Sequence, residues 1–217
     1  MPPVCIQVYI RTMKCHFLDL GTNKLQGVNQ FIERYDMDST WDIHTFDPNP
    51  GLVDFINEEL NSSLKQYDIT AYNVAVGESD DIVEFKATSY DDVAGGTRNW
   101  FVDESMEGCE SKMVHQIDLA RFIEEKEWVK PKDFVVCKMD VEGSEFFLLD
   151  HLIKTGAINT ISDLYVEWHA GEEHHGSEGY EKHIWPVDFS EEDVEYYTEL
   201  KRKVEQDLTQ ISVYTWF

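Results

Sequence analysis

The sequence predicts an α/β fold in which a mostly parallel central sheet is flanked by helices. Short apolar runs alternate along the chain with helical patterns of apolar residues, which is typical of βαβ units. One run, residues 134–140, is almost continuously apolar, as central strands of parallel sheets are. The chain has 217 residues, of which 42% are hydrophobic, so we expect one domain over 1–217 with a buried core.

The first half of the chain is predicted to alternate strands and helices. Apolar residues at spacings of three and four mark one helix over 25–35 and another over 52–64. Four apolar stretches around these helices are predicted strands, the last of them short and alternating: 15–19, 41–46, 69–76 and 82–85. Residues 88–113 are irregular, and a connection of that length is often functional.

The second half continues the same alternation and ends in a strand at or near a sheet edge. Ser190 is predicted to cap the last helix, because Asp193 in its first turn favours a helix N-terminus. The predicted elements are helices at 118–129, 143–153 and 190–207, and strands at 134–140, 164–168 and 211–217.

Composition and charge exclude several classes of protein. The net charge of −25, from 43 acidic and 18 basic residues, repels nucleic acids and anionic membranes. The sequence contains no apolar run long enough for a membrane span and no secretory signal, so we expect a cytoplasmic protein. Its four cysteines form no C-x-x-C pair, which argues against a zinc knuckle or a redox dithiol.

Polar residues follow the first two predicted strands, where ligands bind in open α/β sheets. Asp19 and Gly21 end the first strand, but the dinucleotide fingerprint G-x-G-x-x-G is missing, because the next glycine is Gly27. An acid there suits a cationic amino-acid moiety, although a plain strand–turn–helix is an equal alternative. Asp47 ends the second strand, where a carboxylate either accepts both ribose hydroxyls of an adenosine or caps the next helix.

Three later segments add to this pattern. Residues 73–77 are small and apolar enough to form a slot for adenine, or are an ordinary strand end. Residues 138–145 place one lysine and three acids where a core strand turns into a helix, which packing alone does not require. Glu167 and His169 lie one residue apart on an extended strand and point the same way, so they can share a metal or act as a base and its orienter. The acids and histidines at 172–175 are better explained as a solvated loop.

These segments, in this order, resemble the FkbM-type methyltransferases over about residues 15–170. The most specific element is the K-x-D-x-E-G-x-E block at 138–145. The resemblance implies a Rossmann-like class I methyltransferase fold with S-adenosylmethionine as methyl donor. It also implies O-methylation of a hydroxyl of a sugar or glycan, a deoxyhexose among them.

The resemblance also implies roles by position. Asp19, Gly21 and Asn23 would line the methionine end of the donor. Asp47, with Asn49, would hold the ribose. Asn73 and Ala75 would lie near the adenine. The reacting centre would contain Asp140, which also lies near the donor, together with Glu142, Glu167 and His169. The chain departs from the family pattern at Leu25, where members usually have glycine, and in its single terminal strand, where the fold usually ends in a hairpin.

Methyl transfer to a hydroxyl benefits from removal of its proton. His169 is the first candidate base because its ordinary pKa lies near neutrality, and Asp140 is the second. Alternatively, Asp140, Glu167 and His169 hold a divalent cation, magnesium or manganese, that acidifies the hydroxyl. Acceptor specificity is expected from residues 88–113 and 170–187, where Trp100, Tyr180 and Trp185 can stack on a sugar.

Two other classes of function remain open at this stage. One is a nicotinamide oxidoreductase, against which the missing glycine fingerprint argues. The other is a non-catalytic sugar-binding or partner module that has kept the fold. A small molecule or a glycan is the expected partner, and association with a glycosyltransferase and the oligomeric state are left open.

Overall fold

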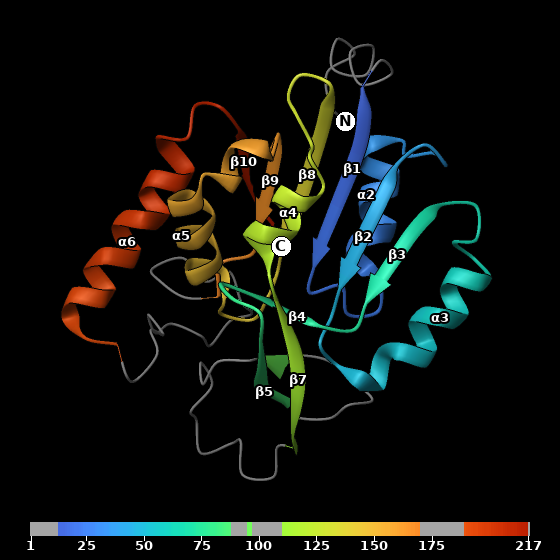
Figure 1. Ribbon diagram of the computed structural model, residues 1–217, viewed down its shortest axis with the longest axis horizontal. Helices are drawn as coiled ribbons and strands as arrows, with labels where there is room; N and C mark the ends of the chain where they lie inside the picture. Colours follow the sequence, from blue (N-terminus) through green and yellow to red (C-terminus); the bar gives the residue numbers. More distant parts are fainter. Residues whose placement is uncertain (1–12, 88–94, 97–109, 170–188, 217) are drawn as a thin grey trace, which may run out of the picture.

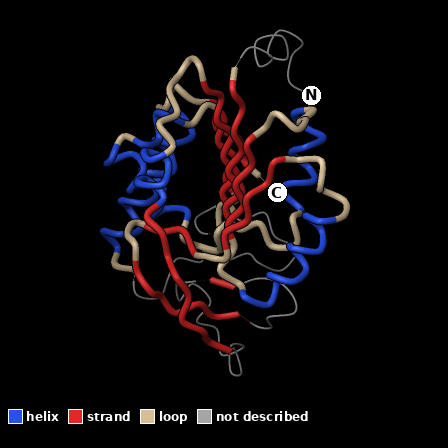
Figure 2. The backbone as a smooth tube through the Cα atoms, turned by 45° about the vertical axis from the view of Figure 1, so that its right-hand side comes forward, coloured by secondary structure: helices blue, strands red, loops and turns tan. Residues whose placement is uncertain are grey.

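The computed structural model describes residues 13–87, 95–96, 110–169 and 189–216. Its central sheet stands between two layers of helices, which is clearest in the view of Figure 2. The predicted α/β fold with a parallel central sheet flanked by helices is therefore confirmed.

The central sheet has six strands in the order β10-β9-β8-β1-β2-β3. All of its neighbouring strands pair in parallel. The strands are β1 (Lys14–Leu20), β2 (Asp42–Phe46), β3 (Asp68–Tyr72), β8 (Asp133–Met139), β9 (Asp163–Val166) and β10 (Ser212–Thr215). The order reverses between β1 and β8, and in such sheets this switch point lies beside the ligand-binding edge.

Side chains alternate between two apolar cores, one on each face of the sheet. Leu18 and Cys137 pack on one face with apolar residues from α4 (Leu119–Glu125), α5 (Glu145–Thr155) and α6 (Glu191–Gln206). Phe17 and Val136 pack on the other face, against α2 (Gln26–Tyr35) and α3 (Val53–Asn61). Burial on both faces explains why the sequence of β8 is almost continuously apolar from Phe134 to Cys137.

Helix ends follow local capping chemistry. Ser190 and Asp193 form a reciprocal capping box that starts α6, as the sequence predicts. Asp118 caps α4, so the predicted helix at 118–129 begins where expected but ends at Glu125. A one-turn helix, η1 (Pro50–Leu52), precedes α3 and is capped by Asn49. Gly156 ends α5 in the left-handed conformation typical of helix C-termini, and a second short helix, η3 (Ala157–Thr160), follows it.

The predicted third strand, 69–76, is wrong as one element, because it is split between two sheets. Residues up to Tyr72 form β3, whereas β4 (Ala75–Gly77) joins a smaller sheet of order β4-β7-β5-β6. At the break, the Asn73 amide donates hydrogen bonds to the carbonyls of Asp47 and Asn49, in place of strand pairing. Local sequence carries no signal for a bond to a neighbouring loop.

The smaller sheet lies below the carboxyl ends of the central strands in Figure 1. It contains β5 (Asp81–Ala87), β6 (Gly95–Gly96) and β7 (Glu110–Asp118). Strand β7 is not predicted from the sequence, because its first residues belong to the irregular stretch 88–113. Most of that stretch, and nearly all of 170–187, lies outside the described residues, so Trp100, Tyr180 and Trp185 are not placed.

The terminal strand β10 is the sheet edge, as predicted, and it pairs in parallel with β9. None of the helices that the structure describes is both long enough and apolar enough to cross a bilayer.

Candidate active site

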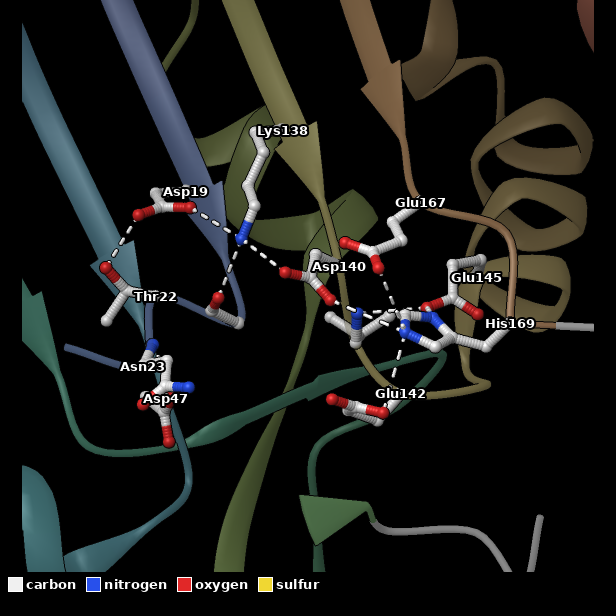
Figure 3. Close-up of polar contacts among 12 residues, drawn as sticks. Asp19, Thr22, Asn23, Asp47, Lys138, Asp140, Glu142, Glu145, Glu167 and His169 are labelled. Carbon is white, nitrogen blue, oxygen red and sulfur yellow. Dashed lines mark hydrogen bonds and ion pairs between the residues drawn. The ribbon is translucent and has the colours of Figure 1, made fainter. Parts of the chain in front are cut away.

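The polar residues that the sequence places at strand ends meet at one edge of the central sheet (Figure 3). Asp19 lies in β1 and Lys138 in β8, and the two are direct partners in the β1–β8 register. Asp47 follows β2 and Asp140 follows β8, while Glu167 and His169 follow β9. Parallel strands direct their carboxyl ends to the same edge, which is why residues far apart in sequence come together.

A buried lysine joins two of these acids. Lys138 Nζ is 3.3 Å from Asp19 Oδ1 and 2.9 Å from Asp140 Oδ2, and it donates a hydrogen bond to the Gly21 carbonyl at 2.8 Å. Burial lowers the pKa of Lys138, but the two carboxylates more than offset that effect and raise it above its ordinary value. Lys138 is therefore a charged group that ties β1, β8 and the loop after β1 together.

The carboxylate of Asp19 faces the interior of the protein. Its side chain is 0% exposed, and its Oδ2 accepts a hydrogen bond from the Thr22 hydroxyl at 2.6 Å. Burial raises the pKa of Asp19, whereas Lys138 and Thr22 act to lower it. A Cβ at Gly27 would lie 2.7 Å from Asp19 Oδ1, so the absence of a side chain there lets α2 approach the carboxylate. Asp19 thus holds the loop after β1 in place from the buried side, through its hydrogen bond with Thr22.

The loop after β1 has an unusual backbone. Gly21, Asn23 and Leu25 all have positive φ angles, of 75°, 45° and 60°. A Cβ on Gly21 would lie 1.7 Å from the carbonyl oxygen of Asp140, so no other residue fits there. Leu25 adopts the left-handed conformation although it is not a glycine, and its side chain is fully buried in the core on the α2 face of the sheet. Strained backbone of this kind is concentrated at functional sites.

Asp47 anchors the same loop from the end of β2. Its Oδ2 accepts a hydrogen bond from the Asn23 backbone N–H at 2.8 Å, and its Oδ1 accepts one from the Asn49 N–H at 2.9 Å. Burial raises the pKa of Asp47 to about 6, although these two hydrogen bonds lower it. Each carboxylate oxygen has two lone pairs, so both oxygens can accept a further hydrogen bond.

Two buried polar atoms beside Asp47 have no hydrogen-bond partner in the described part of the chain. They are the side-chain oxygen of Asn23 and the side-chain nitrogen of Asn49. Buried polar atoms are normally paired, and an exception needs an explanation. One donor and one acceptor next to a carboxylate fit a polar ligand with hydroxyl and amino groups.

His169 lies at the centre of a second group of acids. Its Nδ1 is 2.8 Å from Glu145 Oε1, and its Nε2 is 3.5 Å from Glu142 Oε2 and 3.8 Å from both Asp140 Oδ1 and Glu167 Oε1. Burial lowers the pKa of His169, but Glu145, Glu142 and Asp140 more than offset that effect and raise it to about 10. The imidazole therefore carries a proton near neutral pH in this state, unlike the histidine with ordinary pKa that the sequence analysis assumed.

The carboxylates around His169 influence one another. Burial raises the pKa of Glu142 to about 7, with His169 opposing the shift and the neighbouring acids adding to it. Burial likewise raises the pKa of Glu167. Crowded acids with one shared imidazolium form a site that favours a cation.

The predicted site residues fall into three groups in the structure. Asp140, Glu167 and His169 are brought together, and Asp19 reaches Asp140 through Lys138. Asn23, Asp47, Asn49 and Asn73 form one hydrogen-bonded group. Ala75 is buried in β4 and pairs with Gln116 of the smaller sheet.

Glu145 is a residue of this site that the sequence did not single out. Its carboxylate is 0% exposed and accepts hydrogen bonds from the backbone N–H groups of Val141 and Gly143 as well as contacting His169. The signal available in the sequence was its place in the 138–145 block. Glu145 comes three residues after Glu142, and its side chain folds back onto the backbone of the turn that contains Glu142. The residues at 172–175 lie outside the described ranges.

The fold and the site define a Rossmann-like α/β protein with a polar ligand edge at its switch point. A family model described as the methyltransferase FkbM domain matches residues 19–200, most of the chain. The chain belongs to the FkbM methyltransferase family, which confirms the resemblance found from the sequence.

One solved structure is similar to the chain: methyltransferase FkbM from Methylobacillus flagellatus KT. The sequence identity is 15% and the TM-score is 0.42, and the match covers 71% of this chain and 33% of that one. The match therefore spans about a third of the length of that protein. Comparison with curated proteins gave no match.

Proposed function

We propose that this protein is an S-adenosylmethionine-dependent O-methyltransferase that acts on a hydroxyl of a sugar or glycan. The observation that carries the proposal is the meeting of two polar groups at one sheet edge. One is the Asp47 group, with its unpaired amide atoms, and the other is the acid group around His169. The first suits a nucleoside, and the second suits a reacting centre with developing positive charge.

The donor is proposed to bind along the loop after β1. An ionised Asp47 has lone pairs left for the ribose hydroxyls, and the unpaired side-chain atoms of Asn23 and Asn49 are available for further polar contacts. Gly21 and Asn23 face the methionine end, and Asn73 with Ala75 the adenine. Asp19 acts indirectly in this proposal, because its carboxylate is enclosed by Thr22 and Lys138.

The reaction is an in-line displacement at the methyl carbon of the donor. A bond forms between the hydroxyl oxygen and the methyl carbon, the carbon–sulfur bond breaks, and the hydroxyl proton passes to a base. Because the sulfonium is already activated, the main task of the protein is to align oxygen, carbon and sulfur. The acid group around His169 stabilises the positive charge near the donor.

The proton acceptor is proposed to be a carboxylate of this group. His169 with a pKa of about 10 already holds a proton near neutral pH and is a poor acceptor in this state. Asp140 and Glu167 are the candidates, and their side chains are partly exposed, at 24% and 32%. Asp140 is held in place by Lys138, so it also links the donor loop to the reacting centre.

The test has two measurements on the purified chain. Calorimetry with S-adenosylmethionine measures donor binding, and transfer of a labelled methyl group to a panel of hexosides and deoxyhexosides measures turnover. We expect Asp140→Asn to lose at least 100-fold in turnover while donor affinity changes less, because removal of a catalytic proton acceptor typically has an effect of that order.

A matched control is Glu58→Gln, which removes the same kind of charge from an exposed position on α3. It should leave both measurements unchanged. Absence of donor binding together with absence of labelled product would contradict the proposed function. Donor binding without turnover on any sugar would refute the acceptor class alone.

A further inference from the structure

We propose that the protein binds one divalent cation of the magnesium or manganese kind through Asp140, Glu142 and His169. One ligand atom from each residue can be chosen so that all three lie within 4.8 Å of one another. Ligands lie about 2.0–2.2 Å from such ions, so two ligands of one ion are at most about 4.4 Å apart. Small side-chain rotations therefore bring the three residues to one ion.

The orientation of the histidine ring supports this site independently of the number of acids. Glu145 Oε1 also accepts hydrogen bonds from two backbone N–H groups, so the carboxylate is fixed and acts as an acceptor toward His169 Nδ1. Nε2 is then the ring atom directed at Asp140 and Glu142. Histidines that bind metals usually donate their other ring N–H to a carboxylate in this way.

The separations at Nε2 also fit ligands of one ion. Nε2 stands 3.5 Å from Glu142 and 3.8 Å from Asp140. Both separations lie within the span expected for two ligands of a single ion.

The charge balance of the site also favours a cation. Four carboxylates surround one imidazole, and the positive charge of Lys138 is shared between Asp140 and Asp19. Glu145 is fully buried, and its Oε2 has no hydrogen-bond partner among the residues that the structure describes. A divalent ion would offset this negative charge.

The chemistry of the ligands selects the kind of ion. Two carboxylates suit magnesium and manganese, and the imidazole nitrogen favours manganese over calcium, which takes six to eight oxygen ligands. Binding requires Nε2 without its proton.

This set of ligands differs from the one expected from the sequence, since Glu142 takes the place of Glu167. Glu167 would then be the carboxylate left to accept the hydroxyl proton. In the reaction, the ion would polarise the acceptor hydroxyl. This role rests on the proposed function, whereas the binding of the ion does not.

The experiment is a titration of chelator-treated, dialysed protein with Mn²⁺, in which electron paramagnetic resonance measures the free ion. Neither donor nor acceptor is present. We expect one saturable site from which Mg²⁺ displaces Mn²⁺. Glu142→Gln and His169→Gln should each weaken binding at least tenfold, and Glu145→Gln about tenfold, because the ring loses its orienting partner. Glu167→Gln should weaken binding less than Glu142→Gln, and Glu58→Gln should change nothing.

Absence of a saturable site in the unmodified protein would overturn the proposal, and this measurement does not depend on the folding of any variant. Unchanged affinity in both Glu142→Gln and His169→Gln, with native circular dichroism, would overturn it equally. The proposed function is tested separately by donor calorimetry in the presence of chelator. Mn²⁺ binding without donor binding and without labelled product would leave the metal site standing and contradict the proposed function. Donor binding and methyl transfer without a saturable Mn²⁺ site would overturn the metal site and leave the proposed function standing.

Discussion

Replacement of Lys138 by methionine tests the electrostatic core of the site. The substitution keeps the length and apolar character of the stem but removes the ammonium group from between Asp19 and Asp140. Asp140 is partly exposed, so water can compensate for the loss, whereas Asp19 is enclosed on all sides. The expected consequence is an uncompensated buried carboxylate at Asp19.

The magnitude follows from the two ways in which Asp19 can respond. Loss of one partner of a buried ion pair destabilises a protein by about 3–5 kcal/mol. Asp19 can instead take up a proton, which limits the loss to the free energy of protonation at the working pH. From the ordinary pKa of 3.8, that limit is about 4 kcal/mol at pH 7 and about 2 kcal/mol at pH 5, at about 1.4 kcal/mol per pH unit.

The sign of the pH dependence is therefore fixed. In Lys138→Met the pKa of Asp19 is raised further in the folded state, so the variant binds more protons when folded than when unfolded. Its stability relative to the unmodified protein falls as pH rises from about 4 toward neutrality. The double variant Lys138→Met with Asp19→Asn should recover most of the loss at pH 7, because the buried charge is gone.

Urea unfolding followed by circular dichroism at pH 5 and pH 7 measures these changes. Lys154→Met is the matched control, because Lys154 lies 2.6 Å from Asp150 but its side chain is 65% exposed, against 3% for Lys138. An exposed pair of this kind contributes little to stability, so the control should change little at either pH. The reasoning is refuted if Lys138→Met behaves like Lys154→Met at pH 7, or if its loss does not shrink at pH 5.

Three further predictions concern the loop after β1. Gly27→Ala should destabilise the protein by about 1–3 kcal/mol in thermal unfolding, since the new Cβ would lie 2.7 Å from the locked Asp19 carboxylate; stabilisation, the usual effect in a helix, would contradict the packing. Leu25→Gly should also destabilise the protein. Loss of a fully buried leucine costs about 2–5 kcal/mol, whereas relief of its left-handed backbone contributes only about 1–2 kcal/mol. A variant that is more stable in thermal unfolding would show that the backbone strain dominates. Donor affinity should rise about tenfold between pH 5 and pH 7. Asp47 has a pKa of about 6, and its carboxylate accepts hydrogen bonds from hydroxyls best when it is ionised. If calorimetry finds the same rise in Asp47→Asn, the pH dependence belongs to another group.

Much of the fold could be predicted because its signals are local. Apolar periodicity located the strands and helices of the central sheet, and the Ser190–Asp193 cap was readable because its residues are neighbours in sequence. The split after Tyr72 could not be predicted, because it depends on the hydrogen bonds from Asn73 to the carbonyls of Asp47 and Asn49. The strand β7 was hidden for a similar reason, since its partner β5 comes more than twenty residues earlier.

The edge of the sheet at which these polar residues meet was predictable for the same reason as the strands. Acids that directly follow apolar runs lie at the carboxyl ends of parallel strands, and those ends share one edge of the sheet. The sequence therefore places Asp47 and Asp140 at the same edge of the sheet, but it does not say which groups touch. The bridging by Lys138 and the protonation of His169 depend on distances between side chains from different strands.

The sequence by itself determined the α/β class, the family and the edge of the sheet that carries the polar residues, because these follow from the order of residues along the chain. Only the tertiary structure decided that Asp19 is enclosed and that Glu142 stands closer to His169 Nε2 than Glu167 does. It alone decided that Glu145 holds the imidazole ring. The physical reason is that burial and charge coupling depend on separations of a few ångströms, which are set by sheet order and by backbone turns such as the left-handed Glu142.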